Sequence, residues 1–269
     1  MLTEQQLAQF EEEGYLLLSG LIPQETVTKA RAAMWHMMGM DADNPSSWEP
    51  SDAAGKSELA IRSKHPPHSE FYMQRAGTRT ELFGVTDPDL LACCTPDYLA
   101  ILKQLASQYP EIPHCERQHP DGIWAINKFP VSAEWKRPTP HLDGGFRDLR
   151  LDPGTFRVTS LTYLTDANAH SGTTIIWPEG PQRIREFRKN NPEFSNHIRD
   201  MGTQFQKMDL GEPIEVVVKN GDVLFFHHLL PHNGTMNVGS APRFAIRYMC
   251  LCHTCRRWEK KEEWNLWMP

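Results

Sequence analysis

The sequence predicts a mainly β domain of the sandwich or jelly-roll type, with helices gathered at the amino end and packed on one sheet. From residue 122 onward, short runs rich in β-branched and aromatic residues alternate with turns that contain Gly and Pro. Asn220-Gly221 separates two of these runs, and this dipeptide is typical of tight β-hairpins. The first 40 residues instead show the apolar spacing of helices, which places the helical layer at the start of the chain.

Two amino-terminal helices follow from local signals. Thr3 with Gln6 three residues later forms a capping box, and the helix that it starts ends at Gly14. After a strand at 15–18, Pro23 leads into a second helix, in which Val27, Ala30 and Met34 recur at helical spacing. We expect a third helix at 96–109 and a short charged one at 181–190.

The rest of the sequence shows the pattern of β-strands, except for one segment that has neither helix nor strand periodicity. We expect strands at 123–129, 156–164, 173–177, 214–218, 222–226 and 243–250. Residues 41–77 are rich in Pro, Ser, Asp and His without periodicity, as in a binding loop or a lid. The sequence therefore predicts a single domain over 1–269, with 41–77 as a loop or lid insertion.

Composition narrows the class of function and the compartment. The net charge is −6 without a basic tract, which does not favour a nucleic-acid partner. No apolar run approaches the roughly 20 residues that span a bilayer, and the first residues lack the pattern of a secretion signal. We therefore expect a cytoplasmic protein without a membrane partner. The cluster of Cys250, Cys252 and Cys255 lacks the second ligand couple of a structural zinc site, so buried thiols are the favoured interpretation.

The most informative motif is His141-Leu142-Asp143, together with His232 some ninety residues later. Residues i and i+2 of a strand point to the same face, so His141 and Asp143 can reach one ion. Two imidazoles and one carboxylate leave coordination positions open, which suits a non-haem iron(II) oxygenase. Arg243 stands eleven residues after His232 in another strand-like run, where a guanidinium can bind the carboxylate of a keto-acid cosubstrate.

These parts, in this order, resemble the phytanoyl-CoA dioxygenase family. The resemblance covers most of the chain, from about Leu2 to Cys250, and is weakest over 41–121. It rests on 2–7 with Gly14-Tyr15-Leu16, on Gly20-Leu21-Ile22-Pro23, on His141-Leu142-Asp143, on 172–180, on 221–226, and on His232 and Arg243.

The resemblance implies a double-stranded β-helix, a jelly roll of the cupin-like type, that holds Fe(II) and 2-oxoglutarate. It implies that His141, Asp143 and His232 are the metal ligands. It also implies that Arg243 binds the distal carboxylate of 2-oxoglutarate, with Arg247 as the alternative residue for this function. The implied reaction uses molecular oxygen, converts 2-oxoglutarate to succinate and carbon dioxide, and oxidises a small organic substrate. The carboxylate of Asp143 favours hydroxylation, because halogenases of this type lack it.

Further cosubstrate contacts are expected from the strands that line the barrel. Asn127 and Thr162 could each bond a keto-acid oxygen, although a purely structural role for either side chain stays open. The chain departs from some relatives at Gly234, where they carry a hydroxyl residue two places after the distal histidine. We expect His227 and His228 to be core residues or outer neighbours of the site.

Two other classes of function remain open from the sequence. A non-catalytic binding module could retain this fold, and it would take up no iron after anaerobic loading. A zinc hydrolase could use His141, Asp143 and His232 to activate a water molecule. Its activity would depend on zinc and would not respond to analogues of 2-oxoglutarate.

Overall fold

The computed structural model describes residues 1–48, 61–65, 69–76, 78–106, 123–142, 156–191 and 208–252. The helices are α1 (Glu4–Glu13), α2 (Gln24–Met38), α3 (Pro88–Leu91), α4 (Pro96–Ala106) and α5 (Gly180–Asn190), with a 3-10 turn at Pro45–Ser47. The strands are β1 (Tyr15–Leu18), β2 (Ile61–His65), β3 (Ser69–Ala76), β4 (Arg79–Val85), β5 (Ile123–Lys128), β6 (Phe156–Tyr163), β7 (Thr174–Ile176), β8 (Ile214–Val216), β9 (Val223–His227), β10 (His232–Gly234) and β11 (Arg243–Cys252).

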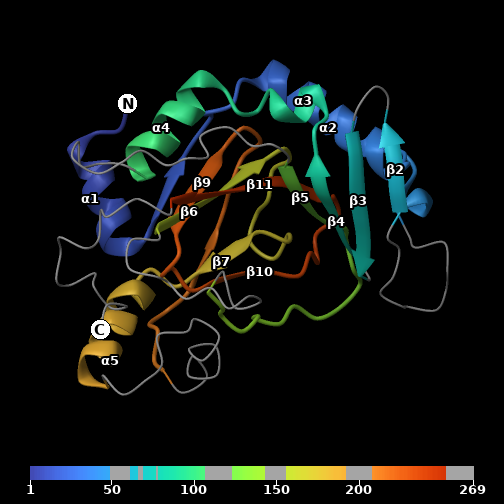
Figure 1. The fold of residues 1–269 in the computed structure, drawn as a ribbon. Coiled ribbons are helices and arrows are strands. Elements are labelled where there is room, and N and C mark those ends of the chain that lie inside the picture. The colour runs from blue at the N-terminus through green and yellow to red at the C-terminus, as the bar shows by residue number, and fades with distance from the viewer. Residues whose placement is uncertain are drawn as a thin grey trace.

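The strands form two antiparallel sheets. The large sheet has the order β1-β9-β6-β11-β5-β4-β3-β2, and the small sheet has the order β10-β7-β8. Helices α1 to α4 run along one side of the large sheet, while β7 and β10 lie on its other side (Figure 1). The predicted fold class, mainly β of the jelly-roll type with amino-terminal helices on one sheet, is confirmed.

Alternation along the central strands creates two cores. On β9, Val223 and Phe225 belong to the core under the helices, whereas Leu224 and Phe226 belong to the core between the two sheets. The helix-side core has its aromatic centre where Phe244 of β11 meets Trp35 of α2, with ring centroids 4.7 Å apart. The two faces of the large sheet therefore have different functions: one anchors the helices, and the other encloses an interior between the sheets.

The amino-terminal helix is tied to the strand that precedes His232. As predicted, Thr3 and Gln6 form a capping box, with Gln6 N donating to Thr3 Oγ1 at 3.2 Å, and Gly14 ends the helix at φ 81°. Strand β1 then pairs with β9. The buried carboxylate of Asp222 strengthens this junction, because it accepts from the backbone N–H groups of Gly20 and Lys219, each at 2.8 Å.

The segment predicted as a loop differs in part from that expectation. Within 41–77, residues 61–65 and 69–76 are strands, and with β4 they extend the large sheet beyond β5. Backbone ladder bonds hold these outer strands, of which β2 forms the edge of the sheet, so they need little apolar alternation in the sequence. The predicted third helix is present as α4 to Ala106, and residues 107–109 lie outside the described part of the chain.

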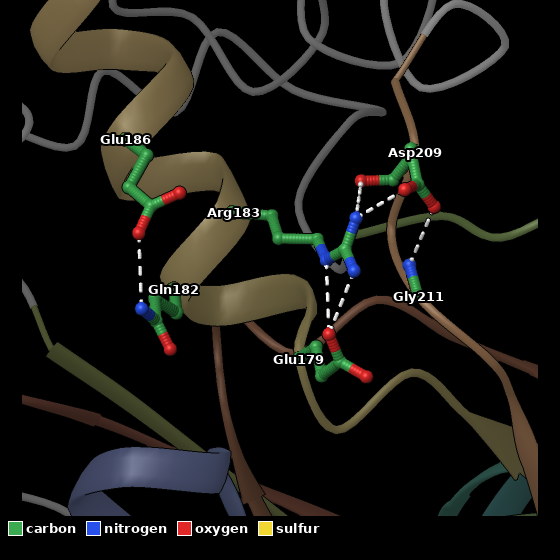
Figure 2. A network of polar contacts seen from close by, with 6 residues as sticks. All are labelled: Glu179, Gln182, Arg183, Glu186, Asp209 and Gly211. Carbon is green, nitrogen blue, oxygen red and sulfur yellow. Dashed lines mark hydrogen bonds and ion pairs between the residues drawn. The ribbon is translucent and has the colours of Figure 1, made fainter.

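A polar network attaches α5 to the segment that leads into β8 (Figure 2). Arg183 Nη2 donates to Glu179 Oε2 at 2.7 Å within the helix, and Arg183 Nη1 donates to the Asp209 carboxylate. Asp209 also accepts from Gly211 N at 3.0 Å. These bonds connect α5 to residues 209–211, just before β8 of the small sheet.

Among the helices of the described segments, none combines the length and the apolar character needed to cross a bilayer.

Candidate metal and carboxylate site

The two predicted histidine ligands lie directly opposite each other. His141 and His232 form an antiparallel bridge, in which each backbone N–H donates to the carbonyl of the other residue at 3.0 Å. Side chains of directly opposed residues leave the ladder on the same face. Accordingly, the two imidazole rings meet with their centroids 4.6 Å apart. Residues far apart in sequence thus bring two imidazole rings to one place, while their function as metal ligands stays a prediction.

The orientation of the His232 ring is fixed by its surroundings. The side chain is buried, and its ring lies 4.5 Å from the ring of Phe226. Its Nδ1 lies 2.9 Å from the carbonyl oxygen of Leu230. A carbonyl can only accept, so Nδ1 carries the proton, and Nε2 is the nitrogen suited to a metal. A backbone carbonyl that orients a histidine in this way is the usual outer partner of a metal ligand.

The third predicted ligand, Asp143, lies outside the described residues, which end at Leu142 in this region. Within the described ranges, no group of three or more His, Cys, Asp or Glu side chains is placed to hold a metal. The complete ligand set of His141, Asp143 and His232 therefore stays a prediction. The two imidazoles fit the proposed metal, since they converge and one is held in a suitable tautomer.

Arg243 begins β11 and points into the interior between the sheets. Its side chain is buried, with Nε donating to Gly172 O at 2.7 Å and Nη1 donating to Ile126 O at 2.7 Å. No described carboxylate forms an ion pair with it. Burial is the main cause that lowers the pKa of Arg243 to about 10, with a smaller contribution from the nearby Arg79. A desolvated guanidinium held by neutral carbonyls is suited to receive an anionic ligand.

Arg247, the predicted rival, lies four residues further along the same face of β11. Its guanidinium carbon lies 4.4 Å from the ring centroid of Trp124, on the neighbouring β5. Arg243 instead lies close to β10, because its Nη2 is 3.9 Å from the position that a Cβ would take at Gly234. Gly234 follows His232 by two residues on the same strand. Of the two arginines, Arg243 is therefore the one shown to lie beside the strand that bears His232.

Asn127 and Thr162 lie on the opposite face from the one expected. Asn127 is fully buried and donates through Nδ2 to the sulfurs of Met34 and Met38 on α2, both at 3.3 Å. Thr162 pairs with strand neighbours that belong to the helix-side core. The expectation that these side chains line the interior near the metal is therefore corrected. Arg243 aligns with Lys128, so the neighbouring Asn127 must point away from it.

Lys128 lies beside Arg243 on the same face of the large sheet, and the sequence alone did not single it out. It pairs with Arg243 across β5 and β11 and reaches from the large sheet to β10. Its Nζ donates to Gly234 O at 2.7 Å and to Thr235 O at 2.5 Å. The pairing of Lys128 with Arg243 places both side chains on the same face of the sheet. This register could not be read from the sequence, so the position of Lys128 was not predicted.

The remaining predicted residues have simpler positions. His227 is buried beside Phe10 of α1, with ring centroids 5.6 Å apart, and its Nδ1 accepts from Leu229 N at 3.1 Å. His228 is also buried. Cys250 and Cys252 belong to β11, and Cys255 lies beyond the described residues.

Comparison with known proteins identifies the family. The model of the phytanoyl-CoA dioxygenase family matches residues 10–245. The chain belongs to this family. Peroxisomal phytanoyl-CoA dioxygenase of Rattus norvegicus is 22% identical over 249 residues, which are 91% of this chain and 65% of the rat protein. The predicted resemblance is thus confirmed. Among the solved structures with this fold, SnoN was crystallised with Fe3+ and α-ketoglutarate, and EvdO2 with 2-oxoglutarate.

Solved structures share the fold at low sequence identity. The non-haem α-ketoglutarate-dependent carbocyclase SnoK from nogalamycin biosynthesis has a TM-score of 0.58 and 18% identity, covering 93% of this chain and 84% of SnoK. The α-ketoglutarate-dependent epimerase SnoN has a TM-score of 0.54 and 14% identity, over 91% and 80% of the two chains. HygX of Streptomyces hygroscopicus, solved with nickel and 2-oxoglutarate, has a TM-score of 0.52 and 16% identity, over 94% and 88%. These likenesses support the jelly-roll assignment.

Proposed function

We propose that this protein is an Fe(II)- and 2-oxoglutarate-dependent dioxygenase that hydroxylates, or otherwise oxidises, a small organic substrate. The observation that carries the proposal is the buried Arg243, which has no described carboxylate partner and lies beside the strand that bears His232. A fold that only needed a packed interior would gain nothing from burying this charge. A dicarboxylate anchored there by its far end can extend toward the imidazole pair.

In this proposal each residue has a distinct function. His141, Asp143 and His232 hold the iron, which supplies the redox chemistry with molecular oxygen and 2-oxoglutarate when bound. Arg243 binds the distal carboxylate and so directs the keto-acid end toward the metal. Tyr163 borders Arg243, with the guanidinium 6.0 Å from its ring centroid, and belongs to the apolar interior that excludes water.

Within this class of oxidation, hydroxylation is the reaction that we propose. Asp143 supports it, because a carboxylate ligand leaves no position for a halide. The epimerase and the carbocyclase share this fold, so other oxidations are the natural alternatives within the proposed class. We also propose a cytoplasmic location; the rat relative is named peroxisomal, and cell fractionation would distinguish the two compartments.

The test is formation of succinate from 2-oxoglutarate by purified protein supplied with Fe(II), ascorbate and oxygen. We expect slow turnover without substrate and faster turnover with a matching metabolite. His141→Ala and His232→Ala should abolish it. His36→Ala, at an exposed histidine of α2 in the helical layer, should not. Undiminished turnover in either ligand variant would overturn the assignment. Activity with zinc that does not respond to 2-oxoglutarate analogues would establish the hydrolase instead.

A further inference from the structure

We propose that Lys128 is a second cation of the 2-oxoglutarate site and donates to the distal carboxylate beside Arg243. This inference rests on the proposed function and deepens it, because it adds a binding residue to the same site. Four observations support it: the strand register, the donors of the two cations, the burial of their charges and the glycine at 234.

The register places Lys128 and Arg243 side by side on the interior face. They are directly paired across β5 and β11, so their side chains leave the large sheet in the same direction. Lys128 then crosses to β10 and donates to the carbonyls of Gly234 and Thr235. Its ammonium group is thereby held at the end of β10, the strand that begins with His232.

The donors of both cations are only partly used. An ammonium group has three N–H donors, and the two carbonyls accept from two of them. Arg243 uses Nε and Nη1 for the carbonyls of Gly172 and Ile126, while Nη2 has no described acceptor. Each cation therefore retains at least one N–H group for a ligand.

The tips of both side chains approach the same point. A Cβ built on Gly234 would lie 2.9 Å from Lys128 Nζ and 3.9 Å from Arg243 Nη2. The two nitrogens are thus near enough for a single carboxylate, whose two oxygens can each accept a charge-assisted bond of about 2.8 Å. Glycine at 234 is required for this arrangement, because any side chain there would displace the ammonium group.

The positively charged neighbours of Lys128 favour the binding of an anion beside it. Burial is the main cause that lowers the pKa of Lys128 to about 7, with smaller contributions from the positive charges of Arg243 and Arg79. Glu81 is the acid that opposes this effect, but it forms an ion pair with Arg79 at 2.5 Å. No described acid forms an ion pair with Lys128 or Arg243. A bound carboxylate would relieve both the desolvation and the repulsion between the two cations.

A purely structural function is the alternative, in which Lys128 only clamps β10 to β5. The two functions differ in how they treat ligands. A structural clamp would affect every keto acid equally, whereas a carboxylate contact matters only for a ligand with a distal carboxylate. The five-carbon keto acid 2-oxovalerate has the same chelating end as 2-oxoglutarate and lacks that carboxylate, so it is the matched probe.

The experiment is anaerobic calorimetric titration of Fe(II)-loaded protein with 2-oxoglutarate and with 2-oxovalerate. Lys128→Gln keeps an amide that can donate to the carbonyls but removes the charge. Gly234→Ala keeps the lysine and displaces its ammonium group. Lys219→Gln, at an exposed lysine paired with Asp166, is the matched control. Thermal melts confirm that each variant is folded.

We expect Lys128→Gln and Gly234→Ala to weaken 2-oxoglutarate binding by about 10- to 100-fold, the range for a hydrogen bond to a charged group. Binding of 2-oxovalerate should stay within about twofold of wild type, as should both ligands with Lys219→Gln. Equal weakening of both keto acids, or no change in 2-oxoglutarate binding, would overturn the inference. If the wild-type protein itself binds neither keto acid, the proposed function fails instead.

Discussion

Replacing Arg243 by Met separates the stability of the fold from the binding of its cosubstrate. Methionine keeps an unbranched apolar stem of similar reach and removes the guanidinium. The two carbonyls that accept from Arg243, on Gly172 and Ile126, lose their donors, at a cost of about 1–3 kcal/mol each. The replacement also removes a charge whose burial opposes folding.

The size of that opposing contribution follows from the pKa. A fall from 12.5 to about 10 corresponds to roughly 3 kcal/mol in favour of the neutral form. Because the folded-state pKa lies below the unfolded one, this penalty is fully present below pH 10 and is relieved only as the pH rises toward 12.5. The loss of the two hydrogen bonds and the removal of the buried charge nearly cancel. Without ligand, the free energy of unfolding of Arg243→Met should therefore differ from that of wild type by no more than about 2 kcal/mol.

Wild type and Arg243→Met should differ in how strongly 2-oxoglutarate stabilises them against unfolding. At about 100 times its dissociation constant, 2-oxoglutarate stabilises wild-type protein by about 2.7 kcal/mol. If Arg243→Met costs about 3 kcal/mol of binding, the same concentration should stabilise the variant by about 0.3 kcal/mol. Urea unfolding of the metal-loaded protein, with and without 2-oxoglutarate, measures both quantities. Full stabilisation of Arg243→Met by 2-oxoglutarate, together with its loss in Arg247→Met, would refute the assignment and favour the rival arginine.

Three further predictions concern pH and the fold. Lys128 should lose its proton as the pH rises through about 7, so affinity for 2-oxoglutarate should fall by up to about tenfold per unit from pH 7 to 9; calorimetry should show a flat profile for Lys128→Gln, and a flat wild-type profile would contradict this. Asp222→Ala should lower the free energy of unfolding by about 2–4 kcal/mol, since two backbone donors lose their acceptor; Asp222→Asn should cost less, and equal losses in urea would argue against the tether. Thr3→Ala should cost about 1 kcal/mol and Thr3→Ser little, and unchanged urea midpoints for both would exclude a stabilising cap.

The sequence correctly predicted features that depend on a few residues of distinctive chemistry. Thr3 with Gln6 predicts a helix start because the two side chains satisfy backbone donors within one turn, independently of the rest of the fold. The pairing of His141 with His232 was predictable for another reason. Few residue types bind metals, so a motif and one distant histidine suggest a common site.

Which face a strand residue occupies was harder to predict. In the run Ile126-Asn127-Lys128, polar residues fall on both faces, so alternation alone cannot show which side meets the interior. The pairing of Lys128 with Arg243 decides it, and that register depends on tertiary contacts. The strands β2 and β3 were missed for a related reason, since the backbone bonds that hold them to β4 leave little trace in the hydrophobic pattern of the sequence.

The central claim is that His141, Asp143 and His232 bind iron where 2-oxoglutarate, anchored at Arg243, can chelate it. Anaerobic visible absorption measures this directly, because a keto acid chelated to Fe(II) produces a charge-transfer band that neither component gives alone. We expect the band in wild-type protein when both are added, and its loss in His232→Ala. Wild-type protein that binds iron and 2-oxoglutarate without producing the band would contradict the account.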